Sequence, residues 1–184
     1  PSIDAAVDTV AAEFGQIEIL VNNAALFTAA PIVEITRADY ARVMDINVGG
    51  TLFTMQAVAR HMIDKGVKGR IINMASQAGR RGESLVAVYC ATKAAVISMT
   101  QSFAKEMGDA KVRVNALLPG ITDTKFASAL VHNDDMQKLL MPHVPLRRVA
   151  QPEEMAGAVL YLASDASSYC TGAALNVDGG YLIG

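Results

Sequence analysis

The amino-acid sequence predicts an α/β protein in which helices flank a doubly wound parallel sheet. Short apolar runs alternate with segments of helical periodicity along all 184 residues, as expected for repeated strand–helix–strand units. Several apolar runs end in polar or small residues, and no linker or internal repeat divides the chain. Ligands of such sheets bind outside the carboxyl ends of the strands, so the polar strand ends indicate where a site is expected.

The composition is typical of a single globular domain that spans residues 1–184, with 52% hydrophobic and 18% charged residues. A net charge of −2 without a basic stripe argues against nucleic acid as a partner. No apolar run is long enough to cross a membrane and no signal peptide is visible, so we expect a cytoplasmic protein. The cysteines and histidines show no ligand spacing, so no metal is expected.

The first half of the chain predicts a helix, a strand and a second helical region. Residues 2–15 have a helical period that ends at Gly15. The run IEILVNNA, residues 17–24, is apolar and then polar, which predicts a buried parallel strand. Thr36 is placed to cap the next helical segment, and a long helical pattern then runs from about Asn47 to Gly66.

The second half continues the alternation. Its apolar runs predict strands at residues 70–76, 111–120 and 173–180. Its helical patterns predict helices at residues 86–107 and 152–163. Residues 122–141 are polar and contain methionines, which suggests a mobile helical lid.

Three side chains have the residue types of an alcohol–carbonyl redox centre. Ser76 ends a predicted strand, while Tyr89 and Lys93 lie four positions apart on one face of the helix that follows. A phenol has a pKa of about 10, and a nearby cation lowers it. Such a phenol can donate or accept a proton while the serine hydroxyl holds the reacting oxygen. A tyrosine–lysine pair alone is more often simple packing, but Ser76 at the same sheet edge favours the functional interpretation.

Six motifs make the sequence resemble the short-chain dehydrogenase/reductase family over nearly its whole length. They are VNNAA at Val21, DINVGG at Asp45, INMAS at Ile72, YCATK at Tyr89, VNALLPG at Val114 and NVDGG at Asn176. The resemblance implies a Rossmann-like fold and NAD or NADP as cofactor. It also implies a catalytic tetrad of Asn47, Ser76, Tyr89 and Lys93.

The resemblance assigns a role to each member of this tetrad. Tyr89 would be the acid and base, and Ser76 would polarise the substrate oxygen. Lys93 would lower the pKa of the phenol and bind the ribose of the nicotinamide half. Asn47 would hold a water that links Lys93 to solvent.

The same resemblance implies the cofactor contacts. Besides Tyr89 and Lys93 they are Asn22, Ala24, Ala25, Pro119, Gly120, Thr122 and Thr124. Ala25 stands where the family usually has glycine. No glycine-rich phosphate-binding turn precedes VNNAA in the sequence. We therefore expect an N-terminally truncated sequence that lacks the first strands of the family fold and is inactive alone. The choice between NAD and NADP then cannot be predicted, because the residue that decides it lies in the missing part.

The segment around the tetrad looks similar to the polyol dehydrogenases of this family, which oxidise sorbitol- or galactitol-type sugar alcohols to ketoses. Substrate contacts are then expected from Ser76, Gln77 and Tyr89. Two alternatives stay open: a 3-oxoacyl-thioester reductase of the same family, and a non-catalytic remnant that only oligomerises or binds a partner. The family resemblance also implies a homotetramer.

Overall fold

The computed structural model describes residues 2–184 and shows one sheet of parallel strands in the order β1-β2-β3-β4. The strands are β1 (Ile19–Asn22), β2 (Arg70–Met74), β3 (Arg113–Pro119) and β4 (Ala174–Val177). The α-helices are α1 (Ser2–Phe14), α2 (Arg37–Met44), α3 (Thr51–Lys65), α4 (Ala87–Glu106), α5 (Ser128–Val131), α6 (Asp134–Leu140) and α7 (Pro152–Ala163). The predicted α/β class with a parallel, Rossmann-like sheet is confirmed. Within the described chain, no helix has the length and apolar character needed to cross a membrane.

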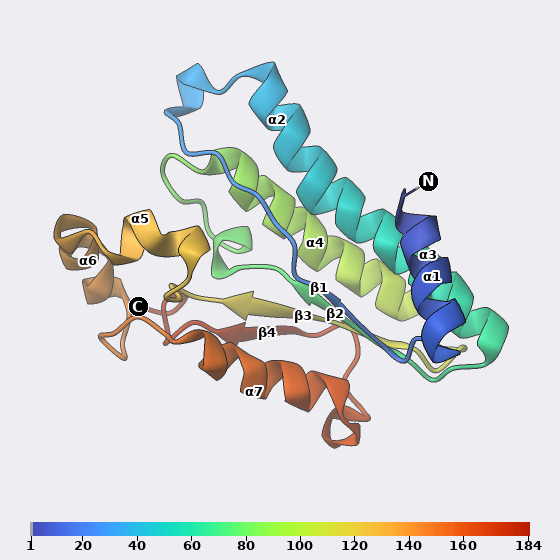
Figure 1. Ribbon diagram of the computed structural model, residues 1–184. Coiled ribbons are helices and arrows are strands. Elements are labelled where there is room, and N and C mark those ends of the chain that lie inside the picture. The colour runs from blue at the N-terminus through green and yellow to red at the C-terminus, as the bar shows by residue number, and fades with distance from the viewer. Residues whose placement is uncertain (1) are drawn as a thin grey trace.

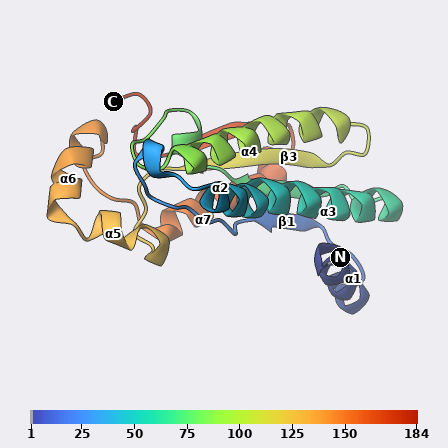
Figure 2. The ribbon, with the colours of Figure 1, turned by 90° about the horizontal axis from the view of Figure 1, so that it is seen from above.

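Helices cover both faces of the sheet. Figure 1 shows α3 and α4 above the strands and α7 below them, and Figure 2 shows α3 and α4 lying side by side over the sheet. The largest core cluster joins Met55 and Met62 of α3 to Ile71 of β2 and Val114 of β3, all fully buried. Helices α5 and α6 lie beyond the carboxyl ends of the strands, where a ligand of such a sheet would bind.

The ends of several helices follow the predicted local chemistry. The Thr36 hydroxyl accepts a hydrogen bond from the Asp39 amide at 3.0 Å and caps α2, as expected. Helix α3 ends at Gly66, whose φ of 66° lies in the left-handed region that favours glycine. At the start of α7, the Glu154 carboxylate accepts a hydrogen bond from the Gln151 amide at 2.8 Å.

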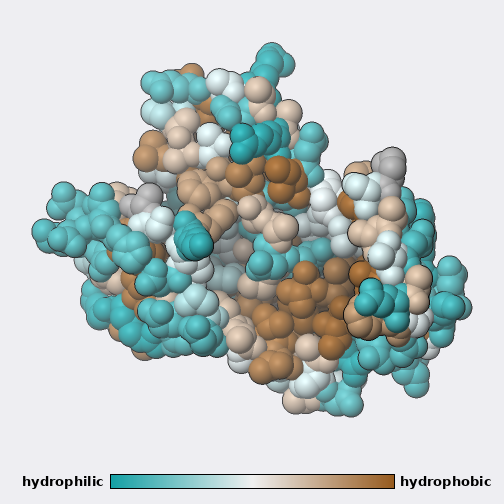
Figure 3. All heavy atoms as spheres, viewed as in Figure 1, coloured by the Kyte–Doolittle hydropathy of each residue, from teal (hydrophilic) through white to brown (hydrophobic). Residues whose placement is uncertain are grey.

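Strand β1 is an exposed edge: Ile19 and Val21 are 47% and 40% exposed, and β1 pairs with β2 alone. Its own run of residues predicts a buried strand, whereas the expected lack of the family's first strands predicts a bare apolar edge, which is what the structure has. Figure 3 shows hydrophobic atoms gathered on the face where β1 and α7 lie. The long helix expected from Asn47 is instead a π-helical turn, η2 (Asp45–Gly50), followed by α3, so that α2 and α3 form one continuous path.

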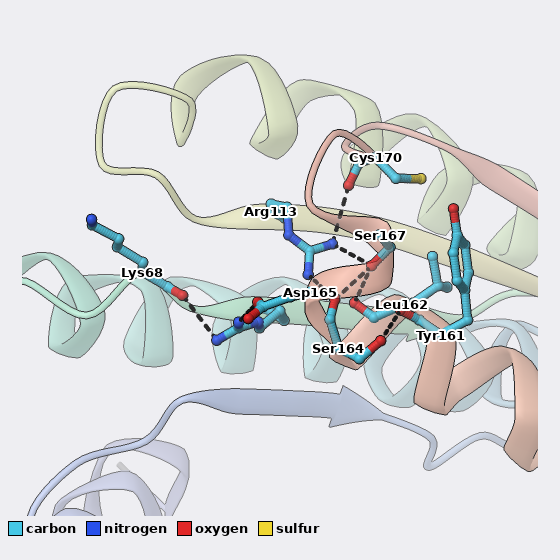
Figure 4. Close-up of polar contacts among 9 residues, drawn as sticks. Lys68, Arg113, Tyr161, Leu162, Ser164, Asp165, Ser167 and Cys170 are labelled. Carbon is cyan, nitrogen blue, oxygen red and sulfur yellow. Dashed lines mark hydrogen bonds and ion pairs between the residues drawn. The ribbon is translucent and has the colours of Figure 1, made fainter.

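A polar cluster lies at the amino ends of β2 and β3 and has a structural role. The Arg113 guanidinium donates hydrogen bonds to the Ser167 hydroxyl at 2.7 Å and to the Ser164 carbonyl at 2.9 Å (Figure 4). Arg70 pairs with Asp165 at 2.5 Å. Through these contacts the segment after α7 packs against the starts of β2 and β3, at the opposite end of the sheet from Ser76.

Candidate active site

Ser76 and Tyr89 meet at the carboxyl edge of the sheet. Strand β2 ends at Met74, and the Ser76 hydroxyl accepts a hydrogen bond from the Ala78 amide at 3.1 Å, which caps the short turn η3 (Gln77–Gly79). Tyr89 lies in the first turn of α4. Burial raises the pKa of its phenol, and a hydrogen bond with Ser76 only partly offsets this effect. The phenol is therefore protonated at neutral pH and ready to donate.

The close approach of β2 and α4 at this point depends on Gly79. A Cβ added there would lie 2.7 Å from the Lys93 carbonyl carbon, closer than real side chains allow. The turn η3 therefore packs directly on the backbone of α4. This contact fixes the distance between the turn that Ser76 caps and the helix that carries Tyr89.

Lys93 is buried beside the phenol with 4% of its surface exposed. Its ammonium donates a hydrogen bond to the Met74 carbonyl at 2.7 Å and lies 5.5 Å from the centroid of the Tyr89 ring. Burial lowers the pKa of Lys93 to about 8. The expected lowering of the phenol pKa is not found, because burial of the phenol dominates. An ammonium has three donors, so two remain for the hydroxyls of a ligand.

Asn47 holds the loop that follows β1 against α4. Its side-chain oxygen accepts from the Leu26 amide at 2.8 Å, and its nitrogen donates to the Leu26 carbonyl at 2.7 Å. The same nitrogen donates to the Thr92 hydroxyl at 3.0 Å. No hydrogen bond joins Asn47 to Lys93 within residues 2–184, so the predicted link through water stays a prediction.

Thr92 is a site residue that the sequence analysis missed. It is fully buried, and its hydroxyl donates to the Tyr89 carbonyl at 2.7 Å while accepting from Asn47. It thus joins the loop after β1 to the turn of α4 that carries the phenol. The sequence does contain a signal for Thr92: its hydroxyl comes immediately before Lys93, in a helical segment otherwise rich in small residues.

We expect Thr92→Val to lower the free energy of unfolding by about 1–3 kcal/mol, because it leaves a buried Asn47 donor without a partner. Turnover should fall with it, since the loop and the Tyr89 turn lose their connection. Denaturant unfolding measures the first effect. Thr9→Val is the matched control, because Thr9 is exposed and its hydroxyl donates to the Ala5 carbonyl of its own helix. Equal stability changes in the two variants would contradict this role.

Two predicted cofactor loops flank Ser76 on either side. At the end of β1 the Asn22 side chain donates to the Asn73 side-chain oxygen at 2.9 Å, which places Asn22 at the carboxyl edge. Ala24 is exposed and Ala25 partly exposed just beyond it. Both side chains are small, so they leave the backbone of this loop approachable.

The second loop follows β3. A Cβ on Gly120 would lie 2.6 Å from the Asp178 Cα, so glycine is needed for Pro119–Gly120 to pack against the turn after β4. The Thr122 hydroxyl donates to the Gly120 carbonyl at 3.1 Å, and Thr124 caps the turn η4 (Lys125–Ala127). The two loops follow β1 and β3, the strands on either side of β2, and the Lys93 ammonium is bonded to the Met74 carbonyl at the end of β2. This arrangement fits an extended ligand that carries hydroxyls, such as a dinucleotide.

An aromatic cluster surrounds the phenol and was also missed. Phe27 follows β1, and Phe126 lies in η4 at the start of the predicted lid. Their ring centroids are 4.8 Å apart and lie 6.3 Å and 6.1 Å from that of Tyr89. The first turn of the predicted lid therefore lies beside the ring of the candidate acid.

Gln77, the remaining predicted substrate residue, follows Ser76 directly. It is 7% exposed, and its amide nitrogen lies 3.5 Å from a Glu83 carboxylate oxygen. Glu83 also pairs with Arg81 at 3.3 Å. The structure thus brings Ser76, Tyr89, Lys93 and Gln77 to one edge of the sheet.

Comparisons with known proteins agree with this geometry. A family model described as enoyl-(acyl carrier protein) reductase matches residues 1–182. The sorbitol dehydrogenase of Cereibacter sphaeroides is 50% identical over 97% of this chain and 73% of that protein. The galactitol 2-dehydrogenase of Agrobacterium fabrum is 46% identical over the same shares. A 3-oxoacyl-[acyl-carrier-protein] reductase of Chlamydia trachomatis also matches, at 39% identity over 97% of this chain and 71% of that protein.

Solved structures give the same result. A gluconate 5-dehydrogenase from Burkholderia cenocepacia, in complex with NADP and tartrate, superposes with a TM-score of 0.94 at 37% identity. The alignment covers 97% of this chain and 70% of that one.

Proposed function

The chain belongs to the short-chain dehydrogenase/reductase family, whose members are NAD(P)-dependent oxidoreductases acting on CH–OH groups, and from this premise we propose that it interconverts a sugar alcohol and its ketose. The observation that carries the proposal is the convergence of Ser76, Tyr89 and Lys93 at the carboxyl edge of the sheet. We further propose that residues 1–184 belong to a single Rossmann-type catalytic domain, of which they form roughly the C-terminal three quarters.

Tyr89 acts as the proton donor in reduction and the proton acceptor in oxidation. Its phenol is protonated at neutral pH, so it can give its proton to a carbonyl oxygen as the alcohol forms. Ser76 holds the same substrate oxygen by a hydrogen bond and so orients the carbonyl toward the phenol. The Lys93 ammonium, 5.5 Å from the ring centroid, stabilises the phenolate that remains.

NAD or NADP supplies or accepts the hydride when it is bound. The residues proposed to hold it are Asn22, Ala24, Ala25, Tyr89, Lys93, Pro119, Gly120, Thr122 and Thr124. Lys93 is suited to bind ribose hydroxyls through its two remaining donors. The structure of the gluconate 5-dehydrogenase named above contains NADP, which supports this class of cofactor.

Sugar alcohols are the favoured substrates for two reasons. The relatives of highest identity named above are a sorbitol and a galactitol dehydrogenase. The loop after Ser76 also presents amide and carboxylate groups, which suit a ligand with several hydroxyls. A 3-oxoacyl-thioester reductase is the second candidate, favoured by the similarity to the Chlamydia trachomatis enzyme.

A substrate panel distinguishes the two candidates. Sorbitol, galactitol, their ketoses and a 3-oxoacyl thioester are assayed with NAD and NADP. We expect oxidation of at least one hexitol and reduction of its ketose, with the thioester reduced poorly or not at all. Turnover confined to the thioester would overturn the sugar-alcohol assignment and establish the alternative.

The proposal includes assembly into a homotetramer. Helix α3 and the preceding turn expose large apolar side chains that a monomer would leave in water: Ile46, Phe53 and Ile63 are 42%, 53% and 49% exposed. Burying such a surface against a second copy is favourable. Light scattering of the purified protein measures its mass and tests this directly.

A further inference from the structure

Asn73 is a fully buried polar residue that contacts one of the residues proposed to hold the cofactor. It lies in β2, one residue before Met74, and its register partner on β1 is Asn22. The Asn73 side-chain oxygen accepts a hydrogen bond from the Asn22 side chain at 2.9 Å. The Asn73 nitrogen donates to the Thr100 hydroxyl of α4 at 2.9 Å and to the Met55 sulfur of α3 at 3.1 Å. Strand β1 and two helices thus meet at one amide.

The Thr100 hydroxyl determines which end of the Asn73 amide faces which neighbour. Thr100 is 1% exposed, and its hydroxyl donates to the Val96 carbonyl of the same helix at 2.8 Å. A hydroxyl has a single hydrogen, so the Thr100 oxygen can only accept from Asn73. The Asn73 nitrogen must therefore face Thr100. The sulfur of Met55 is also an acceptor, though a weak one, and favours the same orientation.

The same reasoning fixes the orientation of Asn22. With its nitrogen toward Thr100, Asn73 presents its oxygen to β1. That oxygen can only accept, so Asn22 must turn its own amide nitrogen toward Asn73. The Asn22 side chain is partly exposed at the carboxyl end of β1, and no hydrogen bond from the described residues reaches its oxygen. The hydrogen-bond relay Thr100–Asn73–Asn22 therefore presents an acceptor where the cofactor is proposed to bind.

An acceptor at this position selects the part of the dinucleotide that binds there. Phosphate oxygens are acceptors too, so the Asn22 oxygen needs a donor: a ribose hydroxyl or the amino group of adenine. Lys93, bonded to Met74 at the end of β2, is proposed to hold the ribose of the nicotinamide half. Asn22 lies one strand further from the loop after β3, so an extended ligand reaches it with the adenosine half. The adenosine ribose is joined directly to the pyrophosphate, and its hydroxyls are therefore the nearer donors.

We propose that Thr100 and Asn73 are positioning residues for the cofactor: they hold the Asn22 amide with its oxygen toward the ligand, and this oxygen accepts a hydroxyl of the adenosine ribose. The inference rests on the proposed function, because it concerns the cofactor of that reaction. Helix α4 then positions both halves of the dinucleotide, the nicotinamide half through Lys93 and the adenosine half through Thr100.

Cofactor binding to the full-length enzyme, measured by fluorescence titration without substrate, tests this inference. The probes are NADH or NADPH, whichever binds more tightly, and reduced nicotinamide mononucleotide, which lacks the adenosine half. Thr100→Val keeps the shape of the side chain but loses its hydroxyl. In this variant Kd for the dinucleotide should rise about fivefold, as expected for one lost hydrogen bond. Kd for the mononucleotide should stay within about twofold, the size of effects away from a contact.

Two further variants are matched controls. Thr100→Ser keeps the hydroxyl and should bind the dinucleotide within about twofold of wild type. Thr54→Val removes a hydroxyl that also donates to a carbonyl four residues earlier, that of Gly50 at 2.7 Å, but takes no part in the relay. It should leave both Kd values within about twofold. Equal weakening of both ligands in Thr100→Val, or the same weakening in Thr54→Val or Thr100→Ser, would show a merely structural role and overturn the inference.

A double variant tests whether Thr100 acts through Asn22. Asn22→Ala removes the acceptor and should itself raise Kd for the dinucleotide about fivefold. Adding Thr100→Val should cause no further increase, because the group that Thr100 positions is already absent. Additive increases would overturn the inference. Asn22 is partly exposed, so Asn22→Ala alone still tests the ligand contact if Thr100→Val does not fold.

An analogue of the dinucleotide distinguishes the ribose hydroxyl from the adenine amino group. Hypoxanthine in place of adenine removes the amino group and keeps the ribose. Asn22→Ala should weaken binding of this analogue by the same factor as binding of the natural cofactor. An analogue whose Kd does not respond to Asn22→Ala would assign the contact to the amino group and overturn the ribose assignment.

Failure of the inference is distinguishable from failure of the proposed function. A wild-type enzyme that binds neither NADH nor NADPH overturns both. A wild-type enzyme that binds a dinucleotide and oxidises sorbitol, with Asn22→Ala and Thr100→Val leaving Kd unchanged, overturns only the relay. Turnover confined to the 3-oxoacyl thioester, with the expected changes in Kd, overturns the sugar-alcohol assignment and supports the relay.

Discussion

Replacing Tyr89 by phenylalanine is expected to reduce turnover by about 10²–10⁴-fold, the range that general acid–base catalysis supplies. The phenolic hydroxyl is the only group at the site that we assign to move the proton. The ring itself should stay in place, because Phe27 and Phe126 pack against it and not against the hydroxyl alone. The melting temperature should therefore change little.

Steady-state assays of ketose reduction between pH 6 and 10 measure this effect. Tyr161→Phe is the matched control, since Tyr161 lies on α7, is 43% exposed and is far from the sheet edge that carries Ser76. If Tyr89→Phe kept more than about a third of wild-type activity, the loss would fall short of any acid–base contribution, and the assignment of Tyr89 would be wrong.

The order of strands and helices could be predicted from the sequence because it depends on local patterns. The strand at residues 70–76 and the helix cap at Thr36 each depend on residues that are adjacent in the sequence, and the structure contains both as expected. The exposure of β1 does not follow from its own run of residues; it follows from the expectation that the first strands of the family fold are missing. The run ILV at residues 19–21 is apolar on both faces, but exposure depends on which elements lie beside a strand, and among the described residues β2 is the only strand paired with β1.

The site shows the same division between local and tertiary information. Ser76, Tyr89 and Lys93 are recognisable from spacing, because a strand end and the next helix turn are close in sequence. Phe126 comes from a segment far along the chain, and its contact with Tyr89 follows only from the folded arrangement. The pKa of the phenol was predicted with the wrong direction for the same reason. A sequence shows that a cation is near, but not how deeply both groups are buried.

Replacing Lys93 by methionine is expected to reduce turnover and to stabilise the fold at the same time. Turnover should fall by about 10²-fold or more, as when one preorganised electrostatic donor is removed from an active site. Stability should rise because burial, which lowers the pKa of Lys93 to about 8, is a cost to the charged form. Below pH 8 this cost is fully present, and removing it should increase the free energy of unfolding by about 2 kcal/mol, net of the lost bond to the Met74 carbonyl.

The pH dependence of stability separates this explanation from ordinary repacking. The ammonium has a folded-state pKa of about 8 and an unfolded value of 10.5, so between these values the unfolded chain binds more protons. The contribution of Lys93 to stability therefore rises with pH across that interval. The gain from Lys93→Met should be largest at pH 7 and should shrink toward pH 10, as measured by denaturant unfolding at each pH. Lys105→Met, an exposed change on the same helix, should show no such trend. A gain that stays constant from pH 7 to 10, or a loss at pH 7, would show that Lys93 is not held in a costly charged state, and its ammonium would then need a partner other than the Met74 carbonyl.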